Sequence, residues 1–207
     1  MIITLIGMSN IGKSYLAARL AAEEGFEMIA CDSLIEAAMA DELKHLGFSG
    51  INDVGRWMGQ PYTANYAANS AKYIKCEREI MLQIIEHLKH SKATQPIVID
   101  TTGSVIYTGD DIAETLRKLT KIVYLEVPEE HRRKLFEQYL KEPKPVIWGD
   151  SYSRQPGESE YDSLARCYPN LLTFRENGFR KIAHSSIPYE SHRGKALDLK
   201  SFVSSLA

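Results

Sequence analysis

The sequence predicts an α/β fold in which helices cover both faces of a parallel sheet. Short apolar runs alternate with longer segments of helical periodicity, and this alternation is typical of parallel strands joined by crossover helices. The apolar runs are continuous rather than alternating, which indicates strands that are buried on both faces. With 207 residues, 44% of them hydrophobic and 25% charged, the chain suits a single domain with a core of ordinary size.

Five segments are expected to form the strands. Each is short and apolar, and several are rich in branched aliphatic residues or bounded by glycine or proline. The expected strands are residues 1–6, 26–31, 96–100, 121–127 and, with the weakest pattern, 182–187. Because helical segments separate them, these strands are expected to run parallel.

The segments between the strands are mostly expected to be helical. Apolar residues recur there at helical spacing, and glycine or proline marks several of the ends. The expected helices are residues 14–24, 33–46, 67–91, 110–119, a helix opened by Pro128, 162–179 and 195–206. Two stretches show no period: residues 47–66 are expected to be irregular, and residues 143–160 to form a loop or mobile flap.

Composition excludes several classes of protein. The net charge of -2 gives the whole molecule no electrostatic affinity for nucleic acid or for an anionic membrane. The three cysteines, Cys31, Cys76 and Cys167, form no C-x-x-C pair, so neither a disulfide framework nor a structural zinc site is expected. No apolar run has membrane-spanning length. We therefore expect a cytoplasmic protein, monomeric or homodimeric, that has no nucleic-acid or membrane partner.

A phosphate-binding motif directly follows the first expected strand. Residues 7–14 read GMSNIGKS and fit G-x-x-x-x-G-K-[ST], the P-loop of nucleotide-binding proteins. Gly7 allows a sharp turn, Gly12 allows the backbone to approach phosphate, Lys13 reaches the β- and γ-phosphates, and the Ser14 hydroxyl binds Mg²⁺. The expected residues for binding ATP are Gly7, Ser9, Asn10, Ile11, Gly12, Lys13, Ser14 and Tyr15.

An acidic residue ends the third expected strand. Asp100 follows an apolar run, where a carboxylate can hold the water shell of Mg²⁺; the alternative is a carboxylate that caps a turn. Residues 100–103 also match the D-x-x-G of GTPases, but the chain contains no Asn-Lys pair to read guanine. The GTPase class is therefore disfavoured.

The chain resembles the shikimate kinase family of P-loop small-molecule kinases, beginning with this P-loop and the segment CDSLIE at residues 31–36. The family has D-x-D-x-x-I-E there, and an alignment on Ile35 and Glu36 places Asp32 on the second aspartate, which contacts the substrate hydroxyl. Ala30 replaces the first aspartate, which lies near the metal. The resemblance implies a five-stranded sheet with the order 2-3-1-4-5, which is the three-layer P-loop NTPase sandwich.

Further similar segments extend through the chain. Residues 124–128, YLEVP, look like the fourth strand of the family, and residues 144–147, KPVI, match the R-P-L-L of its lid, with Lys144 for arginine. The pattern from Leu172 to Ala183 places Arg175 on a substrate-binding arginine. The chain departs from the family in two places. Thr102-Gly103-Ser104 replaces a triple-glycine turn, and Ile74 replaces an arginine that binds the carboxylate of shikimate.

The sequence therefore predicts an ATP- and Mg²⁺-dependent kinase that phosphorylates a hydroxyl of a small molecule. The expected catalytic residues are Lys13, Asp32, Arg175 and Lys144, and the expected metal site is Ser14 with Asp100. An acceptor subdomain is expected at about residues 33–75 and a lid at about 140–160. Two alternatives stay open: a nucleoside or nucleotide kinase with Trp57 or Tyr62 stacked on a base, and a regulatory P-loop protein with little transferase activity.

Overall fold

The predicted sheet is confirmed in order and direction. The computed structural model describes residues 1–90, 95–142, 144–193 and 197–206. Its five strands run parallel in the order β2-β3-β1-β4-β5. They span Ile2–Ile6 (β1), Glu27–Ala30 (β2), Ile97–Asp100 (β3), Lys121–Leu125 (β4) and Ser185–Ile187 (β5). The expected helix end at Ser91, the expected helix start at Lys195 and Pro143 of the expected lid lie outside the described residues.

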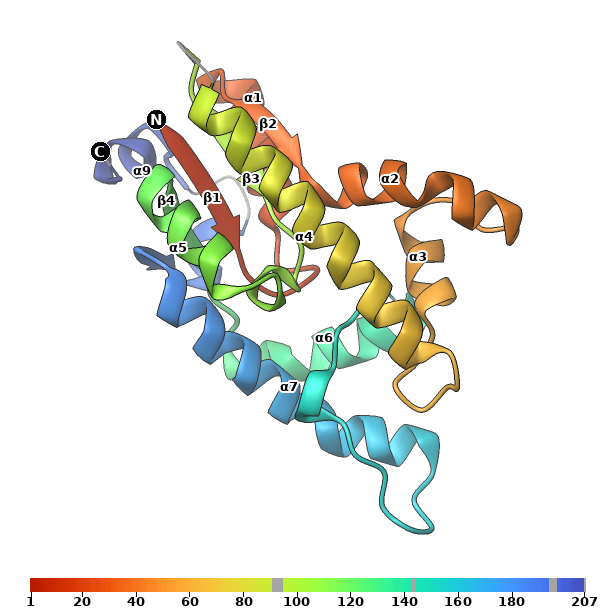
Figure 1. Ribbon diagram of the computed structural model, residues 1–207. Helices are drawn as coiled ribbons and strands as arrows, with labels where there is room; N and C mark the ends of the chain where they lie inside the picture. The colour runs from red at the N-terminus through yellow and green to blue at the C-terminus, as the bar shows by residue number, and fades with distance from the viewer. Residues whose placement is uncertain (91–94, 143, 194–196, 207) are drawn as a thin grey trace.

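Helices pack on both faces of the sheet, as right-handed crossover connections require. Figure 1 shows α4 and α5 in front of the sheet on either side of β1, with α1 on the other side of the sheet and the two termini close together. The main helices span Lys13–Glu24 (α1), Cys31–His45 (α2), Ile51–Met58 (α3), Tyr66–His90 (α4), Asp110–Leu119 (α5), Glu129–Lys141 (α6), Glu160–Ile182 (α7) and Leu199–Ser205 (α9). The fold is thus a three-layer sandwich.

The core lies between the sheet and these helices. In the central strand β1, the side chains of Ile3, Leu5 and Ile6 are fully buried, and β3 and β4 contribute similar continuous apolar runs. Strands buried on both faces cannot alternate polar and apolar residues, which explains the pattern in the sequence. Because the strands run parallel, the carboxyl ends of β1, β2 and β3 meet at one edge of the sheet, where loops emerge from the core.

Two helices were not expected from the sequence. Helix α3 lies within the stretch that was expected to be irregular, between Gly50 and Gly59. It is short and contains Gly55, so its propensity is weak, but Val54, Trp57 and Met58 are buried against the core. Tertiary packing stabilises it. The four-residue α8, Tyr189–His192, is too short to show a sequence period.

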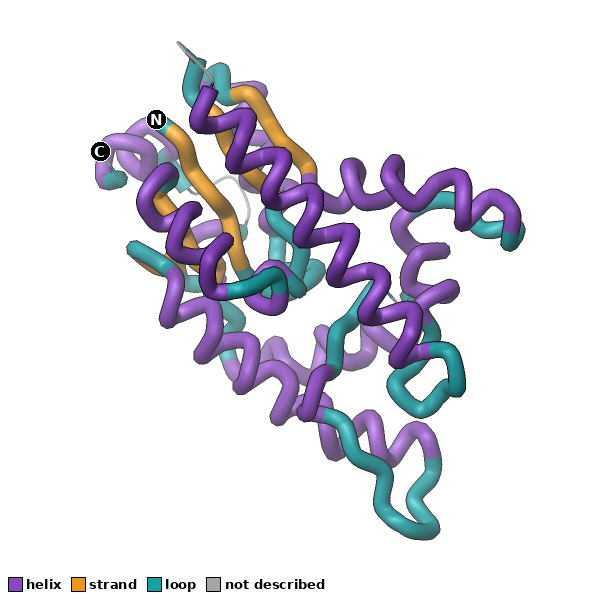
Figure 2. The backbone as a smooth tube through the Cα atoms, in the orientation of Figure 1, coloured by secondary structure: helices purple, strands orange, loops and turns teal. Residues whose placement is uncertain are grey.

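The segment from Lys144 to Glu160 is mainly a loop, and its first part is anchored. Figure 2 shows it as loop, with one short helical turn, between α6 and α7; the turn is η2, Gly149–Ser151. Trp148 is fully buried, and its backbone N–H donates to the hydroxyl of Tyr66 in α4 (2.8 Å), which donates in turn to the Val146 carbonyl (2.9 Å). The N-terminal end of α4 therefore anchors the first part of this loop.

Candidate functional site

The P-loop connects β1 to α1, and its glycines adopt backbone conformations with positive φ that other residues rarely adopt. Gly7 has φ 147°, and a Cβ there would lie 2.9 Å from the carbonyl oxygen of Leu125. Gly12 has φ 110° and forms the N-cap of α1, and Asn10, with φ 64°, is the one described non-glycine residue with positive φ. These left-handed conformations bend the loop around the N-terminus of α1, where N–H groups can face an anion.

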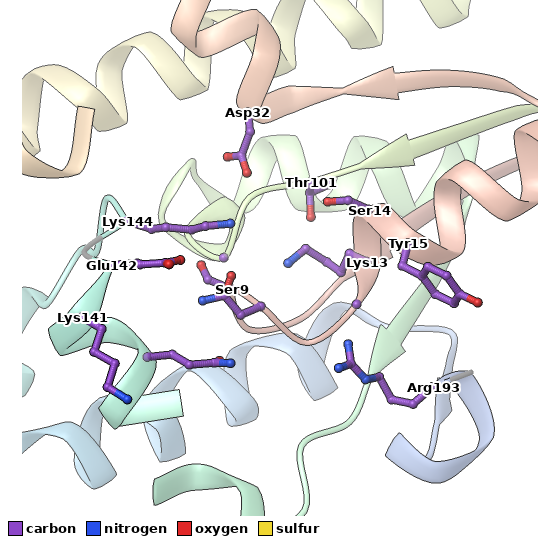
Figure 3. Close-up of a pocket in the computed structure, with 14 residues that line it drawn as sticks. Ser9, Lys13, Ser14, Tyr15, Asp32, Thr101, Lys141, Glu142, Lys144 and Arg193 are labelled. Carbon is purple, nitrogen blue, oxygen red and sulfur yellow. The ribbon is translucent and has the colours of Figure 1, made fainter. Parts of the chain in front are cut away.

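A cleft of about 440 Å³ opens beside this loop. The P-loop forms its floor, while the start of α2, the turn after β3, the end of α6 and the segment after β5 supply its walls (Figure 3). Fourteen residues line it: Ser9, Asn10, Gly12, Lys13, Ser14, Tyr15, Asp32, Thr101, Gly103, Gln138, Lys141, Glu142, Lys144 and Arg193. Six of the eight expected nucleotide-binding residues are among them.

The other two expected nucleotide-binding residues do not line the cleft. Gly7 lies where the strand ends, and the Ile11 side chain is buried in the hydrophobic core. Ile11 can therefore contribute only backbone groups to phosphate binding. Its side chain anchors the loop to the protein interior, which explains why an apolar residue fits at this motif position.

Lys13 is folded back onto its own loop. Its ammonium group donates to the carbonyl oxygens of Gly7 (3.1 Å) and Met8 (2.8 Å), and the side chain is buried. Burial lowers the pKa of Lys13, and the carboxylates of Asp100 and Asp32 act in the opposite direction. The ammonium group therefore has polar partners in the protein and lies beside the cleft that an anion would enter.

Asp32 lies in the first turn of α2 and points into the cleft (Figure 3). The alternative that Asp32 is the N-cap of this helix is wrong, because α2 begins at Cys31 and its N-cap is Ala30, without a side-chain cap bond. Burial raises the pKa of the Asp32 carboxyl, whereas Lys13 and Lys144 lower it. A carboxylate with a raised pKa is a stronger proton acceptor, as a general base requires.

Asp100 is buried at the end of β3, and its Oδ1 atom has no hydrogen-bond partner among the described residues. Buried carboxylate oxygens without partners are rare, so this atom has capacity for a further ligand such as metal-bound water. Ser14 lines the cleft, and its hydroxyl has no hydrogen-bond partner among the described residues. The donor set of Ser14 and Asp100 therefore fits a Mg²⁺ ion that retains several waters and binds phosphate.

The turn after β3 shows how the chain accommodates its departure from a triple glycine. The hydroxyls of Thr102 and Ser104 point away from the cleft and donate to the two carboxylate oxygens of Glu77 in α4, the second at 2.6 Å. Of Thr102, Gly103 and Ser104, Gly103 lines the cleft, and a Cβ there would lie 2.8 Å from Ser9 Oγ and 3.1 Å from Ser9 N. Only the middle position of the turn therefore requires glycine.

Glu77 is a buried carboxylate that the sequence reasoning gave no role. Its side chain is 1% exposed, and burial raises its pKa to about 7, although the two hydroxyl donors lower it. Its position on the apolar side of α4 was the available signal, since a glutamate there needs polar partners from another element. Those partners come from the turn after β3, more than twenty residues further along the chain.

Lys144 lines the cleft, whereas Arg175 lies behind the wall of the cleft. Figure 3 shows Lys144 pointing toward the region where Lys13 and Asp32 also end. Arg175 is only 3% exposed and does not line the cleft. Its Nη2 donates to the carbonyl of Ile147 (3.0 Å), its guanidinium lies 5.6 Å from the ring centroid of Tyr107, and its Nε has no partner among the described residues.

Arg175 nevertheless reaches the edge of the cleft. Its Nη1 lies 3.3 Å from the position that a Cβ of Gly103 would occupy. The structure thus brings Lys13, Asp32 and Lys144 together in one cleft and places Arg175 behind Gly103. Sequence reasoning missed Gln138, Lys141 and Glu142 at the end of α6, and Arg193 after β5. Solvated charges in helices and loops carry no signal of their own until the fold places them at a site.

Among the described residues, no group of three or more histidine, cysteine, aspartate or glutamate side chains is arranged to hold a metal ion. None of the described helices is both long and apolar enough to cross a membrane.

Solved structures share this fold over nearly the whole chain. A shikimate kinase from Acinetobacter baumannii in complex with shikimate is 20% identical, with a TM-score of 0.62 over 99% of this chain and 91% of that one. A shikimate kinase from Bacteroides thetaiotaomicron is 19% identical, with a TM-score of 0.58 over 100% and 96%. A dephospho-CoA kinase from Campylobacter jejuni is 13% identical, with a TM-score of 0.56 over 99% and 97%.

No protein-family model and no curated protein matches the sequence. The chain has the P-loop kinase fold of shikimate kinases and diverges from them widely in sequence. The resemblance drawn from short motifs is thus confirmed at the level of the fold.

Proposed function

We propose that the chain is an ATP-dependent kinase that transfers the γ-phosphoryl group to a hydroxyl of a small molecule. The observation that carries this proposal is the shared cleft of the P-loop and Asp32. The P-loop provides a phosphate site, and Asp32 provides a carboxylate with a raised pKa at the other wall. A nucleotide and a hydroxyl acceptor can therefore meet between them.

The P-loop end of the cleft suits the phosphates of ATP. Lys13 would exchange its bonds to the loop carbonyls for phosphate oxygens, and the N-terminus of α1 adds its positive dipole end. Ser14 and Asp100 would hold Mg²⁺, Ser14 directly and Asp100 through water. Bound there, Mg²⁺ would neutralise charge on the phosphate oxygens.

The other end of the cleft suits the acceptor. Asp32 would orient the attacking hydroxyl and accept its proton, while Lys144 would neutralise charge on the transferred group. Gly103, held between Ser9 and Arg175, would let the acceptor approach the backbone closely. Phosphoryl transfer depends mainly on such positioning and charge neutralisation.

The acceptor is expected to differ from shikimate. Ile74 is half-buried against the core and offers no charge, and Arg175 is already engaged with Ile147 and Tyr107. Trp57 and Tyr62, the residues considered for stacking on a base, do not line the cleft. A small polar acceptor with at least one hydroxyl fits these walls best.

The test is acceptor-stimulated ADP release from ATP and Mg²⁺ across a panel of hydroxyl-bearing metabolites, with shikimate included. We expect one chemical class to stimulate release and Lys13→Met to abolish it. The phosphorylated product, identified by mass spectrometry, names the acceptor. ATP binding without stimulation by any metabolite would instead support the regulatory alternative.

A further inference from the structure

Arg193 lies against the P-loop although it comes from the opposite end of the chain. It follows α8, and its backbone N–H donates to the carbonyl of Tyr189 (3.1 Å). Its Nη1 lies 3.3 Å, and its Cδ 3.5 Å, from the position that a Cβ of Gly12 would occupy. A Cβ at Gly12 would therefore be in tight contact with the Arg193 side chain, which would have to shift by a few tenths of an ångström.

No carboxylate among the described residues balances the positive charge of Arg193. Its guanidinium lies 5.5 Å from the ring centroid of Tyr189. Gly12 is the N-cap of α1, where the helix dipole repels cations and attracts anions. An arginine at this end of a helix, close to the buried Lys13, is favourable when an anion lies between them.

A second polar group faces the same place. His192 is 1% exposed, and its Nδ1 has no partner in the described part of the chain. This atom lies 3.8 Å from the Cβ position of Gly12. The Nε2 atom donates to the Glu126 carbonyl at 3.5 Å, which orients the ring. The segment after β5 thus directs a cation without a carboxylate partner among the described residues at the phosphate loop, beside a buried imidazole nitrogen that is an acceptor in this tautomer and adds no positive charge.

Figure 3 shows that Lys13 and Arg193 reach the cleft from different sides, Lys13 from the P-loop and Arg193 from the segment after β5. In a P-loop the lysine reaches the β- and γ-phosphates, while the loop backbone cradles the α- and β-phosphates. The position beside Gly12 is therefore the end of the phosphate chain that is nearer to the nucleoside.

We propose that Arg193 binds the phosphate chain of the nucleotide beside Gly12, as a second cation that complements Lys13. This inference rests on the proposed function in requiring a nucleotide in the cleft, and it adds a phosphate-binding residue from outside the motif. Arg193 is exposed, so a smaller residue leaves no core cavity.

Equilibrium binding of two probes to the full chain tests this role. Calorimetry with ADP and Mg²⁺ is compared with inorganic tripolyphosphate, which carries phosphates but no base. For Arg193→Ala we expect both affinities to fall by about 10- to 100-fold, the effect of losing a charge-assisted hydrogen bond. Arg193→Lys should recover part of both. The matched control is Arg133→Ala, whose side chain is 89% exposed on α6 and ion-paired with Glu137.

The outcomes separate the two proposals. If the native protein binds neither ADP nor ATP, the proposed function fails. If it binds ADP and Arg193→Ala binds both probes as tightly as the native protein, the proposal for Arg193 is overturned while the kinase proposal stands. A loss confined to ADP would also overturn it, because Arg193 would then contact the base. Unchanged circular dichroism and thermal unfolding of each variant show that the fold persists.

Discussion

Ala30 and Asp100 are register partners at the carboxyl ends of the neighbouring parallel strands β2 and β3. The metal-proximal aspartate of the resembled family falls on Ala30, and the chain carries an aspartate one strand away instead. Asp100 is buried with an unpartnered Oδ1. We propose that Asp100 supplies, at this edge of the sheet, the carboxylate that the resembled family has on the neighbouring strand.

This relationship predicts that Asp100→Asn weakens the effect of Mg²⁺ on nucleotide binding. A carboxylate that acts through metal-bound water typically contributes about 10- to 100-fold to metal affinity. Calorimetry with ADP in Mg²⁺ and in EDTA gives the ratio of affinities, which should shrink in the variant. Adding Ala30→Asp to Asp100→Asn should restore part of the ratio. An unchanged ratio in Asp100→Asn would assign Asp100 a purely structural role.

Lys13→Met is expected to reduce phosphoryl transfer by several orders of magnitude while the fold survives. The two loop carbonyls that accept from Lys13 lose their donor, but a buried charge is removed as well. These effects oppose each other, so we expect Tm to change by only a few degrees. Turnover and Tm are measured on the same preparation. Native turnover in the variant would rule out a P-loop mechanism.

Asp32→Asn is expected to cut turnover by roughly 10²–10⁴ with ATP affinity nearly unchanged. The amide keeps the shape of the side chain but cannot accept a proton from the acceptor hydroxyl. Asp41→Asn, at an exposed position of the same helix, is the matched control. ATP affinity is measured by calorimetry and turnover with the identified acceptor. Equal turnover in Asp32→Asn and the control would remove Asp32 from the mechanism.

Shikimate is expected to bind poorly. The loss of a charge-assisted contact at Ile74 should weaken binding by about 10- to 100-fold relative to an enzyme that has the arginine. Titration of shikimate in the presence of ADP and Mg²⁺ measures the affinity. Saturation at micromolar concentrations would show that Lys144 or Arg175 performs the task of that arginine.

Glu77 is expected to make stability depend on pH. Its pKa is raised from 4.5 to about 7 in the folded protein, so the folded state holds this proton more tightly than the unfolded state. The contribution of Glu77 to the free energy of unfolding is therefore largest below pH 4.5 and falls as pH rises through about 7, by up to about 3 kcal/mol.

Urea unfolding from pH 4.5 to 8 measures this dependence. The stability of the native protein relative to Glu77→Gln should decline across that range, because the amide does not titrate. Glu79→Gln, exposed two positions away on the same helix, should follow the native protein. Parallel curves for the native protein and Glu77→Gln would show that Glu77 does not change its protonation state in this range.

The sequence by itself determined the phosphate loop and the sheet. Gly7, Gly12 and Lys13 act within eight consecutive residues, so their spacing alone specifies the turn, the exposed N–H groups and the start of α1. The continuous apolar runs determined which strands are buried on both faces, and the family resemblance supplied their order. These properties depend on local backbone geometry and on burial, both of which a sequence pattern records directly.

Only the tertiary structure decided which distant side chains complete the site. Glu77 meets Thr102 and Ser104 because α4 crosses the end of β3, and Arg193 reaches Gly12 because β5 returns the chain to the same edge of the sheet. The segment after α6 is anchored because Tyr66 of α4 lies beside Trp148. Each of these contacts joins residues far apart in the chain, and crossover geometry rather than residue spacing sets their distance.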